Sequence, residues 1–151
     1  MKKRVCVFFA ICMLMINSTV FAESWKDVSF TDAFKLHLDT DDIYYDNTAD
    51  LLVFKIKMEF NDEFKADLAK NFTDKEKKLI DEIAYQVKEE CFDPYERSIY
   101  TRQYTFNDIN GNILHINNTP SEKRIITATE KDIVDIMIIN QVMYYYKLKN
   151  Q

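Results

Sequence analysis

The alternation of hydrophobic and polar positions predicts β-strands along most of the chain. The clearest case is residues 52–60, where apolar side chains occupy every second position and mostly charged side chains lie between them. A period of two is typical of an antiparallel strand with one face on the core. Weaker versions of the same pattern predict further extended segments at 34–38, 43–45, 83–91, 98–107, 112–116 and 124–126.

Two segments predict helices instead. Thr73–Glu76 forms a capping box, in which the threonine hydroxyl and the glutamate carboxylate satisfy free backbone N–H groups at a helix start. We therefore expect a short helix over 74–81, preceded by a helical turn near 64–68. A longer helix is expected to begin at Thr129, with acidic residues in its first turn and lysines in its last, as the helix dipole favours. Its β-branched residues leave a strand as the alternative.

The C-terminal helix has a wide apolar face, which predicts heavy packing on the sheet. Two neighbouring stripes carry it, one with Ile133, Met137 and Tyr144 and the other with Val134, Ile138 and Tyr145. Neighbouring residues of a helix point about 100° apart, so Tyr144, Tyr145 and Tyr146 cannot all face the core. Exposed tyrosine is favoured at protein contacts, so these three are the candidate interaction residues. A helix end that merely covers the sheet edge is the alternative.

Taken together, the elements predict an α+β fold: an antiparallel β-sheet with a short middle helix and a C-terminal helix packed on it. Asn110-Gly111 supports one hairpin, because a type I′ turn needs positive φ at both central positions.

The N-terminus has the order of a secretory signal peptide. Three basic residues at 2–4 precede an unbroken apolar run over 5–16, and small or slender residues follow at Val20 and Ala22. The run is shorter than the ~20 residues that a membrane span needs. We therefore expect a signal peptide over 1–22, cleaved after Ala22, and a single α+β domain over 23–151. The mature chain is then expected to be exported to the periplasm, the cell surface or the exterior.

The net charge expected for the mature chain argues against some classes of binding partner. The whole chain has 20 Lys and Arg against 25 Asp and Glu, and the signal peptide removes three basic and no acidic residues. The mature net charge is therefore −8. Such a surface repels nucleic acid and anionic lipid, because both bind through neutralising cations. No segment after residue 22 has the length and hydrophobicity of a membrane span.

Cys91 is the lone thiol of the mature chain, so an internal disulfide is impossible. It alternates in phase with Ile83, Tyr85 and Val87, whereas Gln86, Lys88 and Glu90 occupy the other phase. We expect Cys91 to be buried, as free cysteine usually is. A bridge to a second molecule and a reactive thiol are the alternatives.

No residue pattern points to catalysis, a cofactor or a metal. His37 and His115 each stand alone, whereas a zinc site needs three or four converging ligands. Both histidines are therefore expected to be solvated. A phosphate-binding glycine loop is impossible, because Gly111 is the one glycine. The acidic turn 39–46 fails the calcium-loop pattern, since Tyr44 stands at its glycine position. A carboxylate pair, or Cys91 beside a histidine, would be invisible in sequence.

Several short segments occur in the order found in the surface-adhesin protein E-like family of exported bacterial proteins, which the chain resembles. They are Trp25, the turn Leu38–Asp46, the strand Val53–Lys57, Cys91, Tyr100–Tyr104 and Asp108–Asn112. Phe54 departs from the tryptophan of the family, and the C-terminus lacks a second cysteine, so the family's disulfide is not expected here. The resemblance implies an antiparallel sheet with a C-terminal helix, no catalysis, and adhesion to host extracellular proteins.

The function expected from these observations is a non-enzymatic, adhesin-like interaction domain of the bacterial envelope or exterior, without cofactor or metal. Its partner would be a protein, for which the resemblance implies a host extracellular protein. A periplasmic small-ligand-binding protein or small hydrolase is the alternative, and a homodimer joined through edge strands or Cys91 is a third.

Export and the state of Cys91 can be checked in one experiment, by intact mass and thiol titration of the secreted, non-reduced protein. We expect the mass of a monomeric chain that begins at Glu23, because cleavage follows Ala22. We also expect a thiol that reacts only after unfolding. A disulfide-linked dimer, or rapid labelling of the native thiol, would contradict the buried cysteine.

Overall fold

The structure is a computed structural model that describes residues 25–28, 34–70, 74–127 and 129–151. The signal peptide expected at 1–22 and the Thr73 end of the capping box lie outside the described residues.

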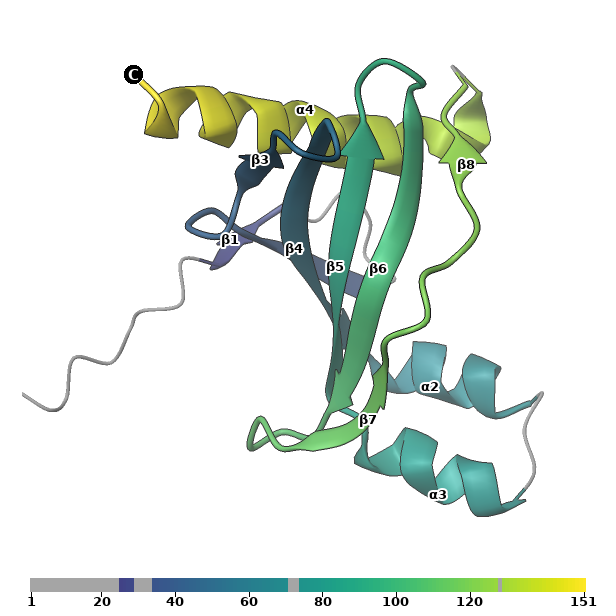
Figure 1. The fold of residues 1–151 in the computed structure, drawn as a ribbon. Coiled ribbons are helices and arrows are strands. Elements are labelled where there is room, and N and C mark those ends of the chain that lie inside the picture. The colour runs from purple at the N-terminus through teal and green to yellow at the C-terminus, as the bar shows by residue number, and fades with distance from the viewer. Residues whose placement is uncertain (1–24, 29–33, 71–73, 128) are drawn as a thin grey trace, which may run out of the picture.

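Eight strands form one antiparallel sheet, which confirms the expected fold class (Figure 1). The strands are β1 (Trp25–Asp27), β2 (Phe34–Asp39), β3 (Tyr44–Asp46), β4 (Leu51–Phe60), β5 (Tyr85–Asp93), β6 (Ser98–Asn107), β7 (Ile113–Asn117) and β8 (Arg124–Ile125). The order across the sheet is β1-β2-β4-β5-β6-β7. β3 pairs with the first part of β4, whereas β2 pairs with its second part. β8 pairs with the first part of β6. The three long strands β4, β5 and β6 are therefore the centre of the sheet.

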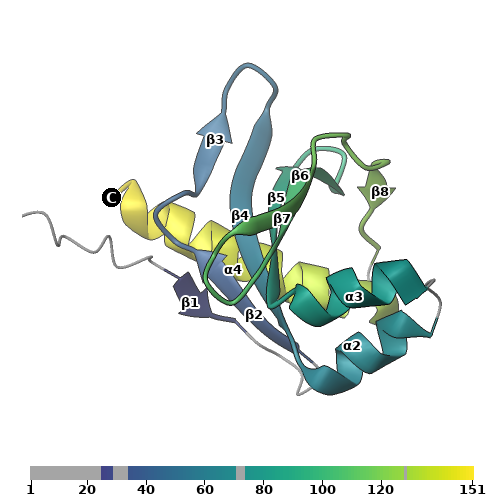
Figure 2. The same ribbon diagram turned by 90° about the horizontal axis from the view of Figure 1, so that it is seen from below.

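The helices lie at the two ends of these long strands. α2 (Asp62–Ala69) and α3 (Asp74–Glu82) connect β4 to β5 at the lower end, as Figures 1 and 2 show. The side chain of Asn61 caps α2, since its Oδ1 accepts a hydrogen bond from the N–H of Phe64 at 2.7 Å. At the C-terminus a 3-10 turn, η1 (Glu130–Asp132), leads into α4 (Ile133–Lys149), which crosses the upper ends of the strands. The C-terminal segment is thus helical, and the alternative of a strand is wrong.

The main core lies between α4 and the upper half of the sheet. Phe54 at the centre of β4 is fully buried, with Leu52 and Ile56 on the same face. α4 packs on this face through Ile138, Ile139 and Val142, and Val142 is fully buried as well. The burial of these side chains, rather than helix propensity, holds α4 on the sheet.

The opposite face of the sheet is also buried at its upper end. Leu51, Val53 and Cys91 form a small second cluster there, against which Tyr100 packs. The half-buried pattern expected for β4 therefore applies only to its second half, where Lys55, Lys57 and Glu59 face away from α4.

The alternation expected for β5 is confirmed, but its polar phase faces the core side. Glu90 pairs with Phe54, Lys88 with Ile56 and Gln86 with Met58, so these polar side chains share the face on which α4 packs. Tyr85, Val87 and Cys91 lie on the other face. The register with β4 decides this outcome, because paired residues in neighbouring strands share a face.

The hairpin between β6 and β7 forms, but the type I′ turn expected at Asn110-Gly111 is wrong. Of these two residues, Gly111 alone has a positive φ, at 85°, and the loop spans residues 108–112. The Asp108 carboxylate organises the loop, because its Oδ1 accepts hydrogen bonds from the N–H groups of Asn110 and Asn112, both at 2.8 Å. The Gly111 N–H also donates to the carbonyl of Asp108 at 3.1 Å, so the side-chain acceptor adds to a backbone turn over 108–111.

Two neighbouring residues of α4 test how far the core depends on this helix. Val142→Ala removes two buried carbon groups beneath the helix and should lower the free energy of unfolding by about 2 kcal/mol. Met143→Ala is the control, since Met143 is 40% exposed and should cost less than about half as much. Urea unfolding of the mature chain measures both. Equal losses in the two variants would contradict the packing of α4 described above.

Candidate interaction face and polar cleft

The helix α4 is apolar on the side that faces solvent as well as on the side that faces the sheet. We define the outer stripe as Ile133, Met137, Tyr144 and Leu148, which are 49%, 37%, 56% and 49% exposed. Their spacings of four, seven and four residues place them along one side of the helix. The buried Ile138, Ile139 and Val142 lie on the opposite side. Of the two stripes expected to pack on the sheet, the one with Ile133, Met137 and Tyr144 is therefore turned outward.

The three candidate tyrosines separate between these two sides. Tyr144 belongs to the outer stripe, whereas Tyr145 and Tyr146 are half-buried and pack against the main core. Tyr144 and Tyr145 also contact each other edge to face, with ring centroids 5.3 Å apart. Only Tyr144 presents most of its ring to a partner.

Charges of opposite sign lie at the two ends of α4. Glu130 and Asp135 lie near its start, and Lys147 and Lys149 lie in its last turn. The start is held in place by the buried Asp132, whose Oδ2 accepts hydrogen bonds from the Thr127 N–H at 3.0 Å and hydroxyl at 2.7 Å. These hydrogen bonds stabilise the carboxylate and lower the pKa of Asp132.

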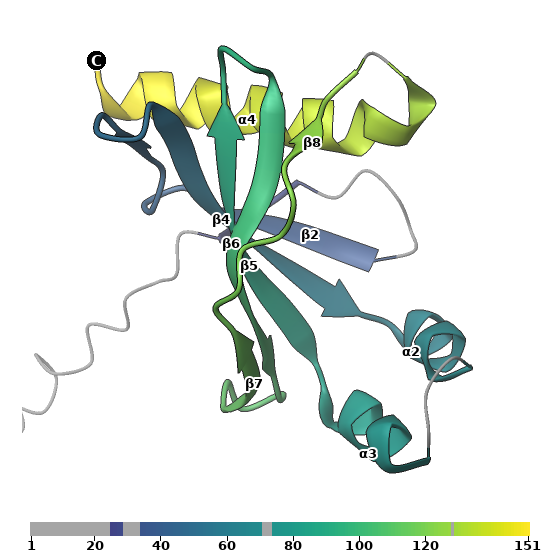
Figure 3. The same cartoon turned by 45° about the vertical axis from the view of Figure 1, so that its right-hand side comes forward.

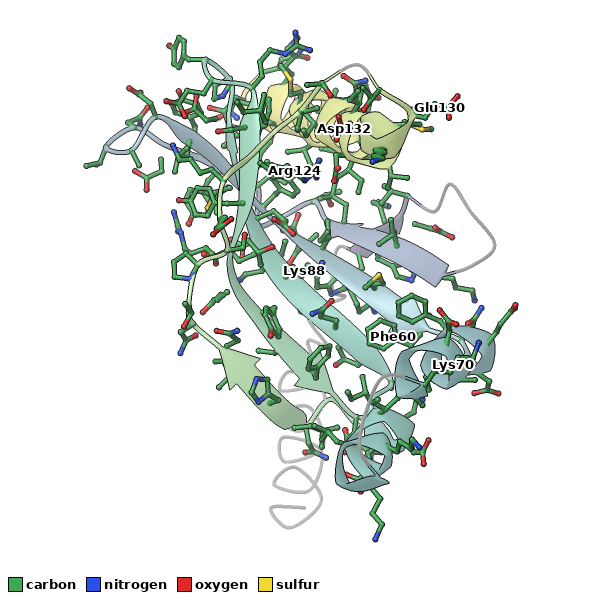
Figure 4. All side chains as sticks on the ribbon, turned by 90° about the vertical axis from the view of Figure 1, so that its right-hand side faces the viewer. Phe60, Lys70, Lys88, Arg124, Glu130 and Asp132 are labelled. Carbon is green, nitrogen blue, oxygen red and sulfur yellow. The ribbon has the colours of Figure 1, made fainter. Side chains whose placement is uncertain are left out.

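A polar cleft lies below α4, on the face of the sheet that α4 covers only at its upper end. Figure 4 looks onto this face, with Lys88 between Arg124 and Asp132 above and Phe60 and Lys70 below. The cleft has a volume of about 450 Å³. It is lined by Gln86, Lys88, Thr101, Tyr104, Phe106, Asn117, Thr119, Pro120 and Ser121.

One wall of the cleft is the segment between β7 and β8, which is fastened to β6. Ser121 donates its N–H to the carbonyl of Thr101 at 2.9 Å, and its Oγ accepts the N–H of Thr101, also at 2.9 Å. Asn117 donates its side-chain N–H to the hydroxyl oxygen of Tyr104 at 3.1 Å. These bonds hold residues 117–121 against the sheet, so the wall of the cleft is preformed.

Glu90 lies next to the inner end of the cleft and is 7% exposed. The hydroxyl of Thr101 lies 3.1 and 3.2 Å from its two carboxylate oxygens and donates to them. Burial raises the pKa of Glu90, and the nearby positive charge of Lys88 acts in the opposite direction. A buried carboxyl group therefore adjoins a cavity with polar walls.

Cys91 is fully buried, as expected. Burial raises the pKa of its thiol, although a hydrogen bond with Tyr100 acts in the opposite direction. No histidine lies beside it. His37 pairs with Lys57, and Lys57 pairs with Val87 on the next strand. Val87 is four residues from Cys91, so His37 is offset from Cys91 by about 13 Å along the strand direction. Arg102 acts on the thiol through its charge, but the thiol has neither the exposure nor the histidine that would make it a nucleophile.

His37 lies on the face away from α4, and its expected solvation is wrong. Its side chain is 17% exposed, with Nε2 3.2 Å from Oε1 of Glu59. Lys57 lies on the same face, with its ammonium 5.4 Å from the ring centre of Trp25 and 5.5 Å from that of Tyr85. The pairings of β1 with β2, of β2 with β4 and of β4 with β5 bring these side chains together. His115, by contrast, is exposed on β7, near the rings of Tyr104 and Phe106.

The acidic turn uses its carboxylates for local contacts. Asp46 accepts the N–H groups of Thr48 and Ala49 at 3.0 and 3.2 Å, and Asp42 forms an ion pair with Lys55. Among the residues that the structure describes, no three histidine, cysteine or acidic side chains are grouped so that they could hold a metal ion.

Sequence reasoning missed the cleft, because its residues come from β5, β6 and the segment after β7 and form no motif. The only signal was the polar phase of β5, with Gln86, Lys88 and Glu90 at alternate positions of a strand at the centre of the sheet. Both faces of a central strand can be covered, so polar side chains there are unfavourable unless they have partners. A run of them at alternate positions therefore points to a functional role.

Comparisons with known proteins identified no relative of the chain. No protein-family model, no curated protein and no solved structure matches the chain. In the part of the chain that the structure describes, none of the helices has the length and hydrophobicity needed to cross a bilayer.

The raised pKa of Glu90 leads to a pH-dependent stability. The folded state holds the proton more tightly than the unfolded chain, so this contribution is complete below the ordinary pKa of 4.5 and is lost as the pH rises through the folded pKa. Glu90→Gln keeps an oxygen for the Thr101 hydroxyl but cannot ionise. Relative to the wild type, its free energy of unfolding should therefore increase as the pH rises above 4.5.

Urea unfolding at a series of pH values measures this difference, and the exposed Glu122→Gln is the matched control. The control should follow the wild type at every pH. A difference between Glu90→Gln and the wild type that stays constant across the series would contradict the buried, titrating carboxyl group.

Proposed function

We propose that the mature chain is an exported, non-enzymatic protein-interaction domain of the bacterial envelope or exterior, which binds its partner through the outer stripe of α4. Export is supported by the basic, apolar and small-residue order of residues 1–22. An interaction function of the adhesin type agrees with the resemblance to the surface-adhesin protein E-like family.

The observation that carries the proposal is the apolar character of both sides of α4. A helix on the surface of a globular domain normally has a polar outer face, and one that is apolar all round is normally buried. Here the outer stripe is 37–56% exposed in the isolated chain. Large, adjacent apolar side chains on a surface indicate a contact with another molecule.

The partner that fits the stripe best is a second copy of the same chain, with the two α4 helices antiparallel. In that arrangement Ile133 lies opposite Leu148, and Met137 lies opposite Tyr144. Asn140 and Gln141 meet at the centre, where their amides can pair. The stripe is therefore complementary to itself, as a twofold interface requires.

Charge supports the same orientation. Antiparallel helices bring Glu130 of one copy towards Lys147 of the other, at both ends of the interface. Asp135 and Lys149 have partners within their own chain, since Asp135 pairs with Arg124 and Lys149 donates to the carbonyl of Asp41. A parallel arrangement would instead place like charges together, which is unfavourable. The mature chain has a net charge of −8, so this local complementarity also offsets the general repulsion between two copies.

A second candidate function is the binding of a small ligand, and the polar cleft favours it. Catalysis is not part of either proposal. The thiol of Cys91 is buried without a neighbouring histidine, which argues against a thiol hydrolase.

The oligomeric state of the mature chain tests the proposed contact. Sedimentation equilibrium should show a monomer–dimer equilibrium for residues 23–151, and Met137→Ser/Tyr144→Ser should be monomeric because it removes the centre of the outer stripe. Met143→Ser is the control: it also removes an exposed methionine of α4, but one about 120° round the helix from Met137. It should dimerise like the wild type, and thermal unfolding should confirm that all variants fold.

A wild type that stays monomeric at every concentration would overturn the pairing of two copies, and a host extracellular protein would then be the partner to test. A control variant that loses the dimer together with the double variant would show that the outer stripe is not the contact.

A further inference from the structure

The lower half of the face beneath α4 is polar where a sheet would ordinarily continue its hydrophobic core. Gln86 and Glu90 are each 7% exposed, and Lys88 between them is half-buried. Burial of an amide, a carboxyl group and an ammonium on one strand is unfavourable unless each has a partner. Polar residues that break the local pattern in this way are expected mainly at functional sites.

We propose that this cleft binds a small polyhydroxylated carboxylate, such as an acidic sugar, with its carboxylate on Lys88. The cleft is separate from the outer stripe of α4, so this proposal does not depend on the dimer. Its volume of about 450 Å³ is within the range of small-molecule sites and leaves room for one or two sugar rings.

Lys88 supplies the charge for the carboxylate. It forms no direct ion pair among the described residues. Glu90, two residues along β5 on the same face, interacts with Lys88 through charge but forms no direct ion pair with it, and its oxygens accept the hydroxyl of Thr101. The ammonium is therefore available as a point charge in a half-buried position, where an ion pair is stronger than at an exposed surface.

The groups around Lys88 match hydroxyls. Gln86 offers an amide that both donates and accepts, and Thr119 offers a hydroxyl. Asn117 keeps its second amide N–H, because its oxygen accepts the N–H of Thr119 at 2.8 Å. Tyr104 accepts its hydrogen bond from Asn117, so its own O–H remains free to donate. A ligand that carries several hydroxyls can satisfy these groups, whereas an apolar ligand would leave them without partners.

Two aromatic rings line the same cleft. Tyr104 and Phe106 lie 5.4 Å apart, edge to face, so they present ring surface to the cleft in two orientations. The negative face of an aromatic ring attracts the weakly positive C–H groups of a sugar ring. One lysine with amides, hydroxyls and aromatic rings fits a singly charged ligand better than a nucleotide, whose phosphates would require several cations.

The experiment is a titration of the ¹⁵N-labelled mature chain with sodium D-glucuronate, followed by amide chemical shifts. D-Glucose, which lacks the carboxylate, and acetate, which lacks the hydroxyls, are the comparison probes. Glucuronate should give saturable shifts with a millimolar dissociation constant at Gln86, Lys88, Thr101 and Ser121. Glucose and acetate should each bind at least about tenfold more weakly.

Lys88→Met should weaken glucuronate binding at least about tenfold, because it keeps the length of the side chain and removes its charge. Lys35→Met is the matched control, since Lys35 is an exposed strand lysine on the opposite face of the sheet, and it should bind like the wild type. Unfolding curves should show that both variants fold.

Three results would overturn the proposal. The first is a wild type without saturable shifts at the cleft, and the second is a folded Lys88→Met variant that binds glucuronate as the wild type does. The third is acetate binding as tightly as glucuronate, which would show that the hydroxyl groups add nothing. None of these measurements depends on the oligomeric state, so a failure here leaves the interaction function standing.

Discussion

The packing of one helix across one end of three long strands is the constraint from which the other features of this molecule follow. β4 and β6 have ten residues each, so they extend about 33 Å, whereas a helix with its side chains is about 10 Å wide. Because α4 crosses the strands, as Figure 3 shows from the side, it can cover only part of their length. Phe54 and Val142 lie where this cover is complete.

The uncovered length of the same face needs another solution, and the chain combines two. α2 and α3 lie at the lower end of the sheet, where Phe60 stacks on Phe64 with ring centroids 5.1 Å apart. Between this end and α4, the face carries Gln86 and Lys88, and the segment fastened by Ser121 forms a wall. The polar cleft is thus the space that remains between two hydrophobic contacts, lined by residues that tolerate water.

The same crossing leaves the whole outer side of α4 uncovered by the sheet. A helix in a groove between two layers would be covered on both sides, but α4 has the sheet on one side only. Its outer stripe is nevertheless almost as hydrophobic as its inner side. Two separate surfaces therefore stand out from an ordinary small domain: an apolar one that suits another protein and a polar one that suits a small ligand.

Local patterns along the chain determined much of the fold. The alternation over 52–60 predicted β4, the tyrosines of 98–107 predicted β6, and the apolar and charged positions after Thr129 predicted the C-terminal helix. These signals are local, because side chains alternate across a strand and repeat every three to four residues along a helix. The burial of Cys91 and the exposure of at least one residue of Tyr144–Tyr146 could be predicted for the same reason.

Only the tertiary structure decided which side of each element is covered. The register between β4 and β5 put Gln86, Lys88 and Glu90 on the face of Phe54, although a reading by hydrophobicity would favour the phase of Val87 and Cys91. The direction in which α4 crosses the sheet decided that Tyr145 is packed and Tyr144 is exposed. The sequence by itself determined the elements and their periods, since these depend on neighbours along the chain. The cleft and the outer stripe depend on contacts between residues far apart in the chain, and these exist only once the sheet has formed.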